Sequence, residues 1–211
     1  MKLTVFGATG GVGRELVRQA LDQGNTVTAV VRDAGRFDLV HSLLQVVTVP
    51  DLGDIDRVRQ AVAGSDAALS GVGPRNRKDV GAASTPTRGI IAGLVAAGTD
   101  RIVAVSASPV GPVPDGDGWL DRHLVHPLVR RVFAGIYADL AVMEADLASS
   151  GLKWTVVRPP RLTDKPLGAY RTAFGANVAR GHFAARADVA NLMLAAVTDE
   201  RAINTAIGVA R

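Results

Sequence analysis

The sequence contains no cysteine, no long hydrophobic run and no block of like charges. Without cysteine the chain has no disulfide, no thiolate metal ligand and no cysteine nucleophile, which fits a reducing compartment. The opening MKLTVF is too short for the apolar region of a signal peptide, and no later run is long enough to span a membrane. We therefore expect a soluble cytoplasmic protein with no membrane partner.

The charged residues are mixed in sign, with a net charge of +4. A basic balance can indicate nucleic-acid binding, but no aromatic-basic stretch or basic recognition helix accompanies it. A small ligand that carries phosphate explains the charge equally well. We therefore expect a small-molecule substrate and no nucleic-acid partner. No coiled-coil pattern is present, and a monomer is the default expectation.

The 211 residues suit one domain, 1–211, with a full hydrophobic core. Apolar runs without polar alternation predict strands covered on both faces, at 2–6, 26–31, 44–49, 67–71, 101–106 and 153–158, with later candidates at 169–174 and 205–210. Helical patterns lie between them at 11–23, 54–63, 85–98, 122–149 (with a break near Gly135) and 187–197. This alternation predicts an α/β fold with a doubly wound parallel sheet of the Rossmann type.

Two irregular regions, roughly 107–135 and 159–185, interrupt this alternation. The first contains a long loop rich in Pro and Gly, ASPVGPVPDGDGWLD. Long loops in compact domains are often functional, and in an open parallel sheet they lie on the ligand side. We expect both regions to form a small substrate-side part of the domain.

A glycine-rich turn follows the first predicted strand, in the sequence VFGATGGVGRELV. The spacing is G-x-x-G-x-x-G. One glycine makes the tight turn, one admits a pyrophosphate to the backbone and one lets the helix pack on the strand. The start of the helix offers unpaired N–H groups to the phosphate. An ordinary tight turn is the alternative, but the strands and helix around it favour dinucleotide binding. The predicted contacts are Gly7, Thr9, Gly10, Gly11, Val12 and Gly13.

The second strand ends in AVVRD, where the choice between NADP and NAD is usually made. An acidic residue there binds the ribose 2′-hydroxyl of NAD, whereas an arginine accommodates the 2′-phosphate of NADP. Arg32 predicts NADP as the cofactor. Asp33 is the residue that would favour NAD, and Arg14 and Arg36 are candidates for the same basic pocket.

The ends of the third and fourth strands supply further candidates. Asp51, in VPDLGD, is placed to accept from an adenine amino group, with Leu52 against the ring, although Asp is also a common turn residue. The stretch SGVGP puts flexible backbone where the cofactor would pass. We therefore include Gly71, Val72 and Gly73 among the predicted cofactor contacts.

Several stretches together resemble the atypical short-chain dehydrogenase/reductases, in the NmrA-like branch that includes biliverdin reductase B-type flavin reductases. They are FGATGGVGRELV, AVVRD, VPDLGD, SGVG, SGLKWTVVRPPRLTD and ARADVANLML. The resemblance covers nearly the whole chain. It implies a Rossmann domain that binds NAD(P), and it places Arg158, Pro159 and Pro160 as a backbone segment beside the nicotinamide. The group contains flavin and quinone reductases, isomerase-like members and sensors without turnover.

The resemblance also implies two catalytic candidates. Ser106 ends the fifth strand, where the wider family has its catalytic serine, with Ser108 as its neighbour. A hydroxyl that bonds loop backbone is the alternative for Ser106. Tyr137 resembles the family tyrosine, with a half-buried aromatic as the alternative, but Ala141 stands where the family has lysine.

The missing lysine limits the chemistry. Without a neighbouring ammonium, the pKa of a tyrosine stays near about 10, and about one hydroxyl in a thousand is ionised at pH 7. Such a tyrosine is a poor base for oxidising alcohols, but it can still donate a proton. The sequence predicts an NADPH-dependent reductase of a flavin, quinone or related acceptor. The alternatives are a non-catalytic nicotinamide sensor and an isomerase or lyase that uses its cofactor in place.

The remaining candidates are weaker. His123 and His126 share a helical spacing without a completing carboxylate, so we expect no metal site. Glu144 is interpreted as a solvated helix carboxylate, with a position facing the cleft as the alternative, and Asp188 as the N-cap of the last helix. Trp119 suits either a cover for a flat substrate or an anchor for its loop, and His182 and Phe183 are candidates for the pocket wall.

Overall fold

The structure is a computed structural model that describes residues 1–74, 76, 79–114, 116–118, 128 and 131–211. Its strands are β1 (Lys2–Phe6), β2 (Thr26–Val31), β3 (Leu44–Thr48), β4 (Ala67–Ser70), β5 (Arg101–Val105), β6 (Lys153–Arg158), β7 (Arg161–Thr163), β8 (Arg171–Phe174), β9 (Phe183–Ala185) and β10 (Thr205–Ala210). Its α-helices are α1 (Gly11–Asp22), α2 (Ile55–Val62), α3 (Ser84–Ala97), α5 (Ala134–Ser149) and α6 (Arg186–Ala196), with short 3-10 turns η1 (Ala34–Arg36), η2 (Ser108–Val110) and η4 (Glu200–Ala202).

One eight-stranded sheet forms the centre of the molecule, in the order β3-β2-β1-β4-β5-β6-β10-β8. Every neighbouring pair in it is parallel except β10 with β8, which is antiparallel. The chain starts in the middle of the sheet, runs outward to β3 and then returns past β1 to β4. This order confirms the predicted Rossmann-type fold. In folds of this type ligands bind at the carboxyl ends of the strands where the direction of winding reverses, which here is between β1 and β4.

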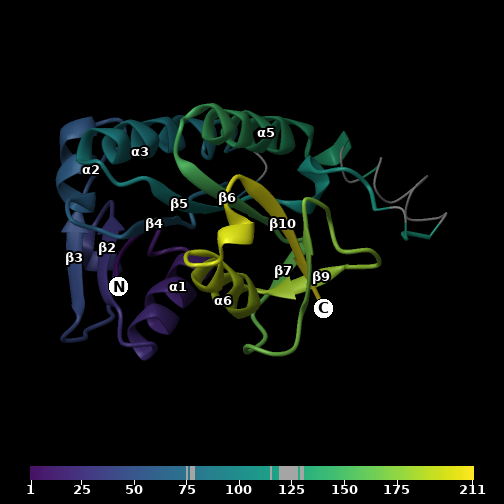
Figure 1. Cartoon of the computed structure of the whole chain (residues 1–211), viewed down its shortest axis with the longest axis horizontal. Helices are drawn as coiled ribbons and strands as arrows, with labels where there is room; N and C mark the ends of the chain where they lie inside the picture. The colour runs from purple at the N-terminus through teal and green to yellow at the C-terminus, as the bar shows by residue number, and fades with distance from the viewer. Residues whose placement is uncertain (75, 77–78, 115, 119–127, 129–130) are drawn as a thin grey trace.

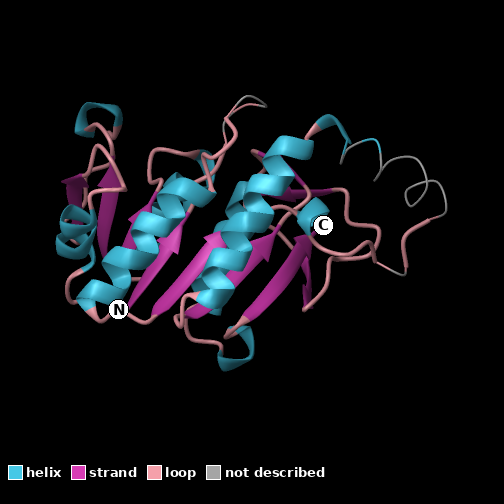
Figure 2. Ribbon diagram, turned by 90° about the horizontal axis from the view of Figure 1, so that it is seen from above, coloured by secondary structure: helices cyan, strands magenta, loops and turns pink. Residues whose placement is uncertain are grey.

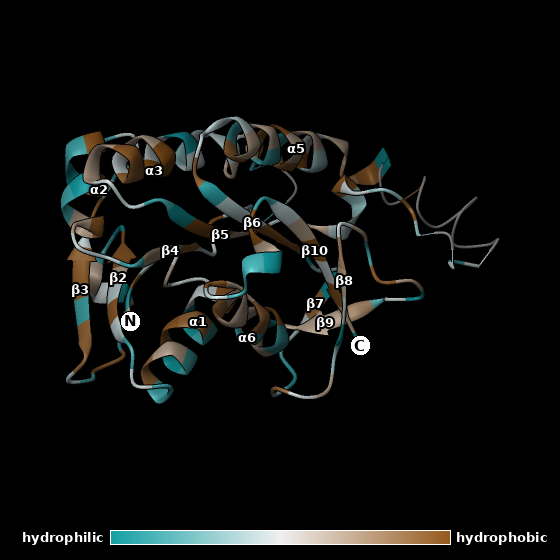
Figure 3. Ribbon diagram, in the orientation of Figure 1, coloured by the Kyte–Doolittle hydropathy of each residue, from teal (hydrophilic) through white to brown (hydrophobic). Residues whose placement is uncertain are grey.

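The helices cover both faces of the sheet. In Figure 1, α2, α3 and α5 lie on one side and α1 and α6 on the other, and Figure 2 shows helices lying over the sheet, roughly along the strands. Each layer closes its own hydrophobic core, one around Leu3, Leu16 and Met193 and the other around Phe6, Ile90 and Leu147. Figure 3 shows the hydrophobic residues in brown along the strands and in the flanking helices. Burial on both faces explains why the strand sequences lack polar alternation.

Three predicted boundaries need correction. The segment 161–163 pairs in parallel with 183–185 as a separate two-stranded sheet, β7-β9, which the sequence pattern does not reveal because each strand has three residues. In the predicted helix 122–149, the break expected near Gly135 is a turn at Phe133: residues 131–132 before it are helical, α5 starts at Ala134 after it, and residues 122–127 and 129–130 lie outside the described part. The predicted strand 169–174 is shorter and begins at Arg171.

Two glycines in α3 let this helix approach its neighbours closely. A Cβ atom at Gly89 would overlap the backbone carbonyl of Leu52, and one at Gly93 would lie 2.7 Å from Cβ of Val58. The four-residue spacing places both glycines on one face of the helix. The loop after β3 is therefore pressed against α3, which fixes the backbone around Leu52.

A buried arginine binds the C-terminal end of α6. Arg101, at the start of β5, donates to the carbonyl oxygens of Ala196 and Val197 at the end of α6, at 2.5 and 3.1 Å. It also donates to Thr155 Oγ1 at 2.7 Å. Burial lowers the pKa of Arg101 to about 10, so the side chain stays charged at neutral pH and complements the negative end of the helix. Arg101 thereby ties the C-terminal end of α6 to β5 and β6.

None of the helices in the described ranges combines the length and the apolar character needed to cross a membrane.

Candidate functional site

The glycine-rich turn brings three backbone segments into direct contact. Gly7 adopts a left-handed conformation (φ +70°), and its carbonyl accepts from Gly10 N at 2.9 Å. A Cβ at Gly7 would lie 2.8 Å from the Gly71 carbonyl carbon, and one at Gly13 would overlap the Gly7 carbonyl oxygen. The ends of β1 and β4 and the first turn of α1 meet here without side chains. This close packing keeps the turn free of side chains at the carboxyl ends of β1 and β4, the region where a Rossmann fold binds a pyrophosphate.

The N-terminus of α1 is open to an anion. The helix starts at Gly11 with Gly10 as its N-cap, no side chain caps it, and its first turn contains no acidic residue. Thr9 therefore does not cap the helix, and its hydroxyl remains a predicted phosphate contact. Val12 is buried and holds the turn against the core. The unsatisfied N–H groups and the partial positive charge of the helix end suit a phosphate.

The basic residues predicted for the 2′-phosphate pocket, Arg14 in α1 and Arg32 and Arg36 after β2, divide into two groups. Arg14 pairs with Asp38 at 2.8 Å and lies over the ring of Phe37, so it holds the loop after β2 against α1. Asp33 turns back to accept from Gly35 N at 3.0 Å. Arg32 and Arg36 are exposed, and within the described ranges neither forms an ion pair. The acidic rival at the end of β2 is thus engaged by its own loop, while Arg32 is free to bind a 2′-phosphate.

The predicted adenine-side residues have mixed surroundings. One carboxylate oxygen of Asp51 accepts from Gly53 N at 2.8 Å, which shows its use as a turn residue. Leu52 and Val72 are half-buried and pack against the core beneath α3. A Cβ at Gly73 would have no atom within 4 Å, so this backbone is open to a ligand. Position 71, in contrast, requires glycine, because a Cβ there would lie 3.1 Å from the backbone nitrogen of Gly13.

Ser106 is a buried polar residue at the end of β5 whose hydroxyl lacks a hydrogen-bond partner among the described residues. Its backbone N–H donates to Val157 O at 2.8 Å, which continues the β5-β6 pairing by one residue. Its side chain is 8 % exposed, and in the described part of the chain its hydroxyl has no hydrogen-bond partner. The alternative that this hydroxyl bonds the loop backbone is therefore not what the structure shows. Buried polar groups without a partner are rare and often belong to binding sites.

Tyr137 lies in the first turn of α5, half-buried, with its ring 5.9 Å from that of Phe133. Burial raises the pKa of its hydroxyl above the ordinary value. Ala141 is exposed one turn later, so this position supplies no cation to oppose the shift. No hydrogen bond joins Tyr137 to Ser106 among the described residues. Tyr137 is therefore protonated at neutral pH and suited to donation rather than base catalysis.

A carboxylate from the same helix holds α5 in place. Asp139 is buried and accepts from Ala83 N at 2.9 Å, from Ser84 N at 3.3 Å and from the Ser84 hydroxyl. It thereby caps the N-terminus of α3 from the neighbouring helix, a contact that sequence analysis missed. The position of Tyr137 relative to the sheet follows from this contact.

Glu144 is not the solvated carboxylate that the sequence suggested. It forms a two-pronged ion pair with Arg158, and the two side chains are 12 and 13 % exposed. The Arg158 guanidinium also lies where a side chain at Gly111 would be, 2.5 Å from its Cβ position. The carbonyl of Pro159 accepts from Ser108 N at 2.8 Å. The Arg158 side chain thus braces the segment 108–111, while Pro160, which is half-buried, stays a predicted backbone contact.

Asp188 is structural, as predicted, but it is the third residue of α6 and not its N-cap. It is fully buried and reaches back to Ala185 N at 2.9 Å, and it accepts from Gly168 N and from Arg211. Phe183 lies in β9 under the ammonium of Lys165, 5.0 Å from the ring centre, and His182 is exposed.

The predicted residues Trp119, His123 and His126 lie outside the described part. Across the described residues, no cluster of three or more His, Cys, Asp or Glu side chains is placed to hold a metal ion.

Sequence analysis also missed a contact at the start of α6. Arg186, the first residue of this helix, lies directly over Gly11 and pairs with Asp164 at 2.5 Å. The available signal was a basic residue at a helix start, the end that disfavours cations.

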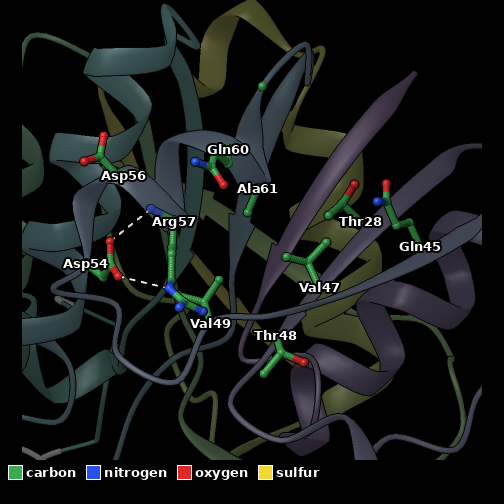
Figure 4. Close-up of a pocket in the computed structure, with 11 residues that line it drawn as sticks. Thr28, Gln45, Val47, Thr48, Val49, Asp54, Asp56, Arg57, Gln60 and Ala61 are labelled. Atoms are coloured by element: carbon green, nitrogen blue, oxygen red, sulfur yellow. Dashed lines mark hydrogen bonds and ion pairs between the residues drawn. The ribbon is translucent and has the colours of Figure 1, made fainter.

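A cavity of about 700 Å³ lies elsewhere, between the edge strand β3 and helix α2. Figure 4 shows its mainly polar lining, including the ion pair between Asp54 and Arg57. None of the predicted site residues lines it, and it lies on the opposite face of the sheet from α1. The cavity is a groove along the sheet edge and does not form part of the candidate site.

The sheet order and the side-chain-free turn at the start of α1 define an NAD(P)-binding protein of the Rossmann class. The chain belongs to the NAD(P)H-binding family, whose sequence model matches residues 7–200.

Three solved structures of similar fold belong to proteins that are named as reductases or dehydrogenases. A proposed NADH-flavin reductase from Streptococcus pneumoniae TIGR4 shares 20% identity (TM-score 0.78), with 100% of this chain and 99% of that chain covered. An anaerobillin reductase from Escherichia coli O157:H7 shares 24% identity (TM-score 0.76; 99% and 97% covered). A short-chain dehydrogenase/reductase from Veillonella parvula DSM 2008, in complex with NADP, shares 20% identity (TM-score 0.75; 100% and 94% covered).

Proposed function

We propose that this protein is an NADPH-dependent oxidoreductase that reduces a flavin, a quinone or a similar conjugated acceptor. The observation that carries this proposal is the buried, unpartnered hydroxyl of Ser106 at the end of β5, two strands from the glycine-rich turn. A hydroxyl there can donate to a carbonyl oxygen of an acceptor aligned with the cofactor. Bound NADPH would supply the hydride, and the chain would supply alignment of two flat rings.

The protonation state of Tyr137 favours this class of acceptor. A tyrosine whose pKa is raised by burial cannot remove a proton from an alcohol at neutral pH, but it can donate a hydrogen bond. Flavins and quinones accept hydride readily, and water can protonate their products. Two of the proteins that share this fold are described as an NADH-flavin reductase and an anaerobillin reductase, which supports a reductase here. We place this activity in the cytoplasm, in a monomer.

The decisive experiment measures NADPH oxidation by the purified protein with FMN, a benzoquinone, a naphthoquinone and an aldehyde, with NADH in parallel. We expect turnover with a flavin or quinone and none with the aldehyde. Ser106→Ala should lower this turnover by at least about tenfold, the effect of one lost hydrogen bond in the transition state. Turnover of the aldehyde alone would contradict the proposal, because that reaction depends most on acid catalysis.

A nicotinamide sensor without turnover is the second candidate. The observation that favours it is Ala141, exposed where a catalytic lysine would stand. Protein that binds NADPH and NADP with comparable affinity, and that is silent with all four acceptors, would establish this candidate instead.

The choice of NADP over NAD rests on Arg32. We expect Arg32→Ala to weaken NADPH binding about 10- to 100-fold, because a charge-assisted hydrogen bond to phosphate contributes about 1.5–3 kcal/mol. NADH lacks the 2′-phosphate, so its affinity should change less than about twofold. Titration of both nucleotides by calorimetry measures the two effects.

Two further variants serve as controls for Arg32. Arg59→Ala removes an exposed arginine on α2 that pairs with Asp56, and it should alter neither affinity. Asp33→Asn tests the rival residue and should leave NADH binding unchanged. Equal losses of NADPH and NADH affinity in Arg32→Ala would remove the argument for the 2′-phosphate.

A further inference from the structure

Arg186 lies across the entrance to the glycine-rich turn. A Cβ atom at Gly11 would be 2.5 Å from Cδ and 2.6 Å from Nε of Arg186. The aliphatic stem of the arginine therefore rests on the first residue of α1, and only glycine leaves room for it. The guanidinium is thereby brought to the end of the helix where the cofactor phosphates are expected.

This is the wrong end of a helix for a cation. The N-terminus of α1 carries a partial positive charge, and its first turn contains neither an acidic residue nor a side-chain cap. Arg186 also occupies the first position of α6, so it adds its charge to two helix N-termini. The guanidinium is held beside two helix N-termini whose partial positive charge repels it. A positive charge in this position indicates a binding site for an anion.

The nearby carboxylates of Asp188 and Asp164 do not provide a firmly held anion for the Arg186 guanidinium. Asp188 is the acidic residue in the first turn of α6, but Arg211 and the N–H groups of Ala185 and Gly168 use its oxygens. Asp164 is the partner of Arg186, at 2.5 Å, and its side chain is 88 % exposed. Among the described residues, the charge of Arg186 is thus balanced by one solvent-exposed carboxylate, an arrangement of small net stability.

We propose that Arg186 binds the pyrophosphate of the nicotinamide cofactor and that Asp164 occupies its guanidinium only until the phosphate arrives. The inference rests on the cofactor site of the proposed function and goes beyond it. It assigns a phosphate contact to a residue 175 positions after Gly11, near the C-terminal end of the chain. Phosphate accepts paired hydrogen bonds from a guanidinium more strongly than an exposed carboxylate competes for them. Asp164 is then a competitor of the cofactor.

The two residues should therefore have opposite effects on binding. We expect Arg186→Met, which keeps an apolar stem over Gly11, to weaken NADPH, NADH and ADP-ribose by a similar factor of about ten or more. Asp164→Asn removes the competitor and should tighten all three about two- to fivefold. Adenosine 2′-monophosphate has no pyrophosphate, and its affinity should not respond to either substitution. Calorimetric titration measures these affinities without turnover.

Other outcomes overturn the inference. Weaker binding in both variants would make the Arg186–Asp164 pair a structural brace, and unchanged binding in Arg186→Met would exclude a phosphate contact. If Arg186→Met does not fold, Asp164→Asn decides alone, because this exposed substitution leaves the core intact; unchanged or weaker affinity would refute competition. Wild-type protein that binds none of the nucleotides would refute the proposed function as well, whereas normal wild-type binding with these results refutes only the role of Arg186.

Discussion

Gly13→Ala is expected to destabilise the protein by about 3 kcal/mol or more and to weaken NADPH binding more than about tenfold. A Cβ at this position would overlap the carbonyl oxygen of Gly7 and lie 2.7 Å from the carbonyl carbon. Because both atoms belong to the backbone, no rotamer change relieves the overlap, and α1 must move away from β1. Alanine is favoured over glycine in a helix by about 1 kcal/mol, which the overlap exceeds. Chemical denaturation and NADPH titration measure the two effects.

Two matched glycine variants separate this overlap from the general effect of adding a methyl group. Gly73→Ala places its Cβ in open space and should change the free energy of unfolding by less than about 0.5 kcal/mol. Gly11→Ala meets only the movable side chain of Arg186, so it should fold normally. A Gly13→Ala protein as stable as wild type would show that the turn is not packed as described.

The parallel sheet could be predicted because its signal is local. Strands covered on both faces are continuous apolar runs, and β1, β2 and β6 begin and end at the predicted residues. The glycine-rich turn was also predictable, since Gly7, Gly10 and Gly13 follow a strand and open a helix. The sequence alone thus determines the fold class and the position of the cofactor turn.

Contacts between distant segments could not be predicted in this way. The pairing of β7 with β9 joins residues 22 positions apart in the sequence, such as Arg161 and Phe183, and neither short segment has a periodicity of its own. Gly89 looks like an ordinary helical glycine until the loop at Leu52 is placed against it. Glu144 looked solvated because its partner, Arg158, lies on a different element. In each case the physical reason for the residue is a neighbour that only the folded chain provides.

The catalytic candidates remain predictions for the same reason. The position of Ser106 at the end of β5 follows from the strand pattern, and its unpartnered hydroxyl becomes visible only in the structure. The position of Tyr137 depends on how Asp139 joins α5 to α3, a contact that no local pattern shows. The turnover measurement with Ser106→Ala tests the role assigned to the Ser106 hydroxyl.

Asp188→Asn is expected to lower the free energy of unfolding by about 2 kcal/mol at neutral pH. The carboxylate is fully buried and accepts from Arg211 Nε at 2.7 Å and from two backbone N–H groups. An asparagine presents a donor where one of these donors now points. We use a modest value because Arg211 is 20 % exposed and can be hydrated when its partner is lost. Asp56→Asn, which removes an exposed pair with Arg59, is the control and should leave the unfolding midpoint nearly unchanged.

The effect of Asp188→Asn should depend on pH in a definite direction. Burial alone would raise the pKa of Asp188, but the hydrogen bonds from Arg211, Ala185 and Gly168 outweigh it and hold the pKa below the ordinary value. A group whose pKa is lower in the folded state stabilises the protein above its unfolded pKa, about 3.9 for aspartate, and this stability is lost as pH falls through the folded pKa. The difference between wild type and Asp188→Asn should therefore be constant from about pH 5 to pH 8 and shrink below about pH 4. Denaturation curves across this range measure it, and a difference that grows toward acid pH would mean that Asp188 is protonated in the folded protein.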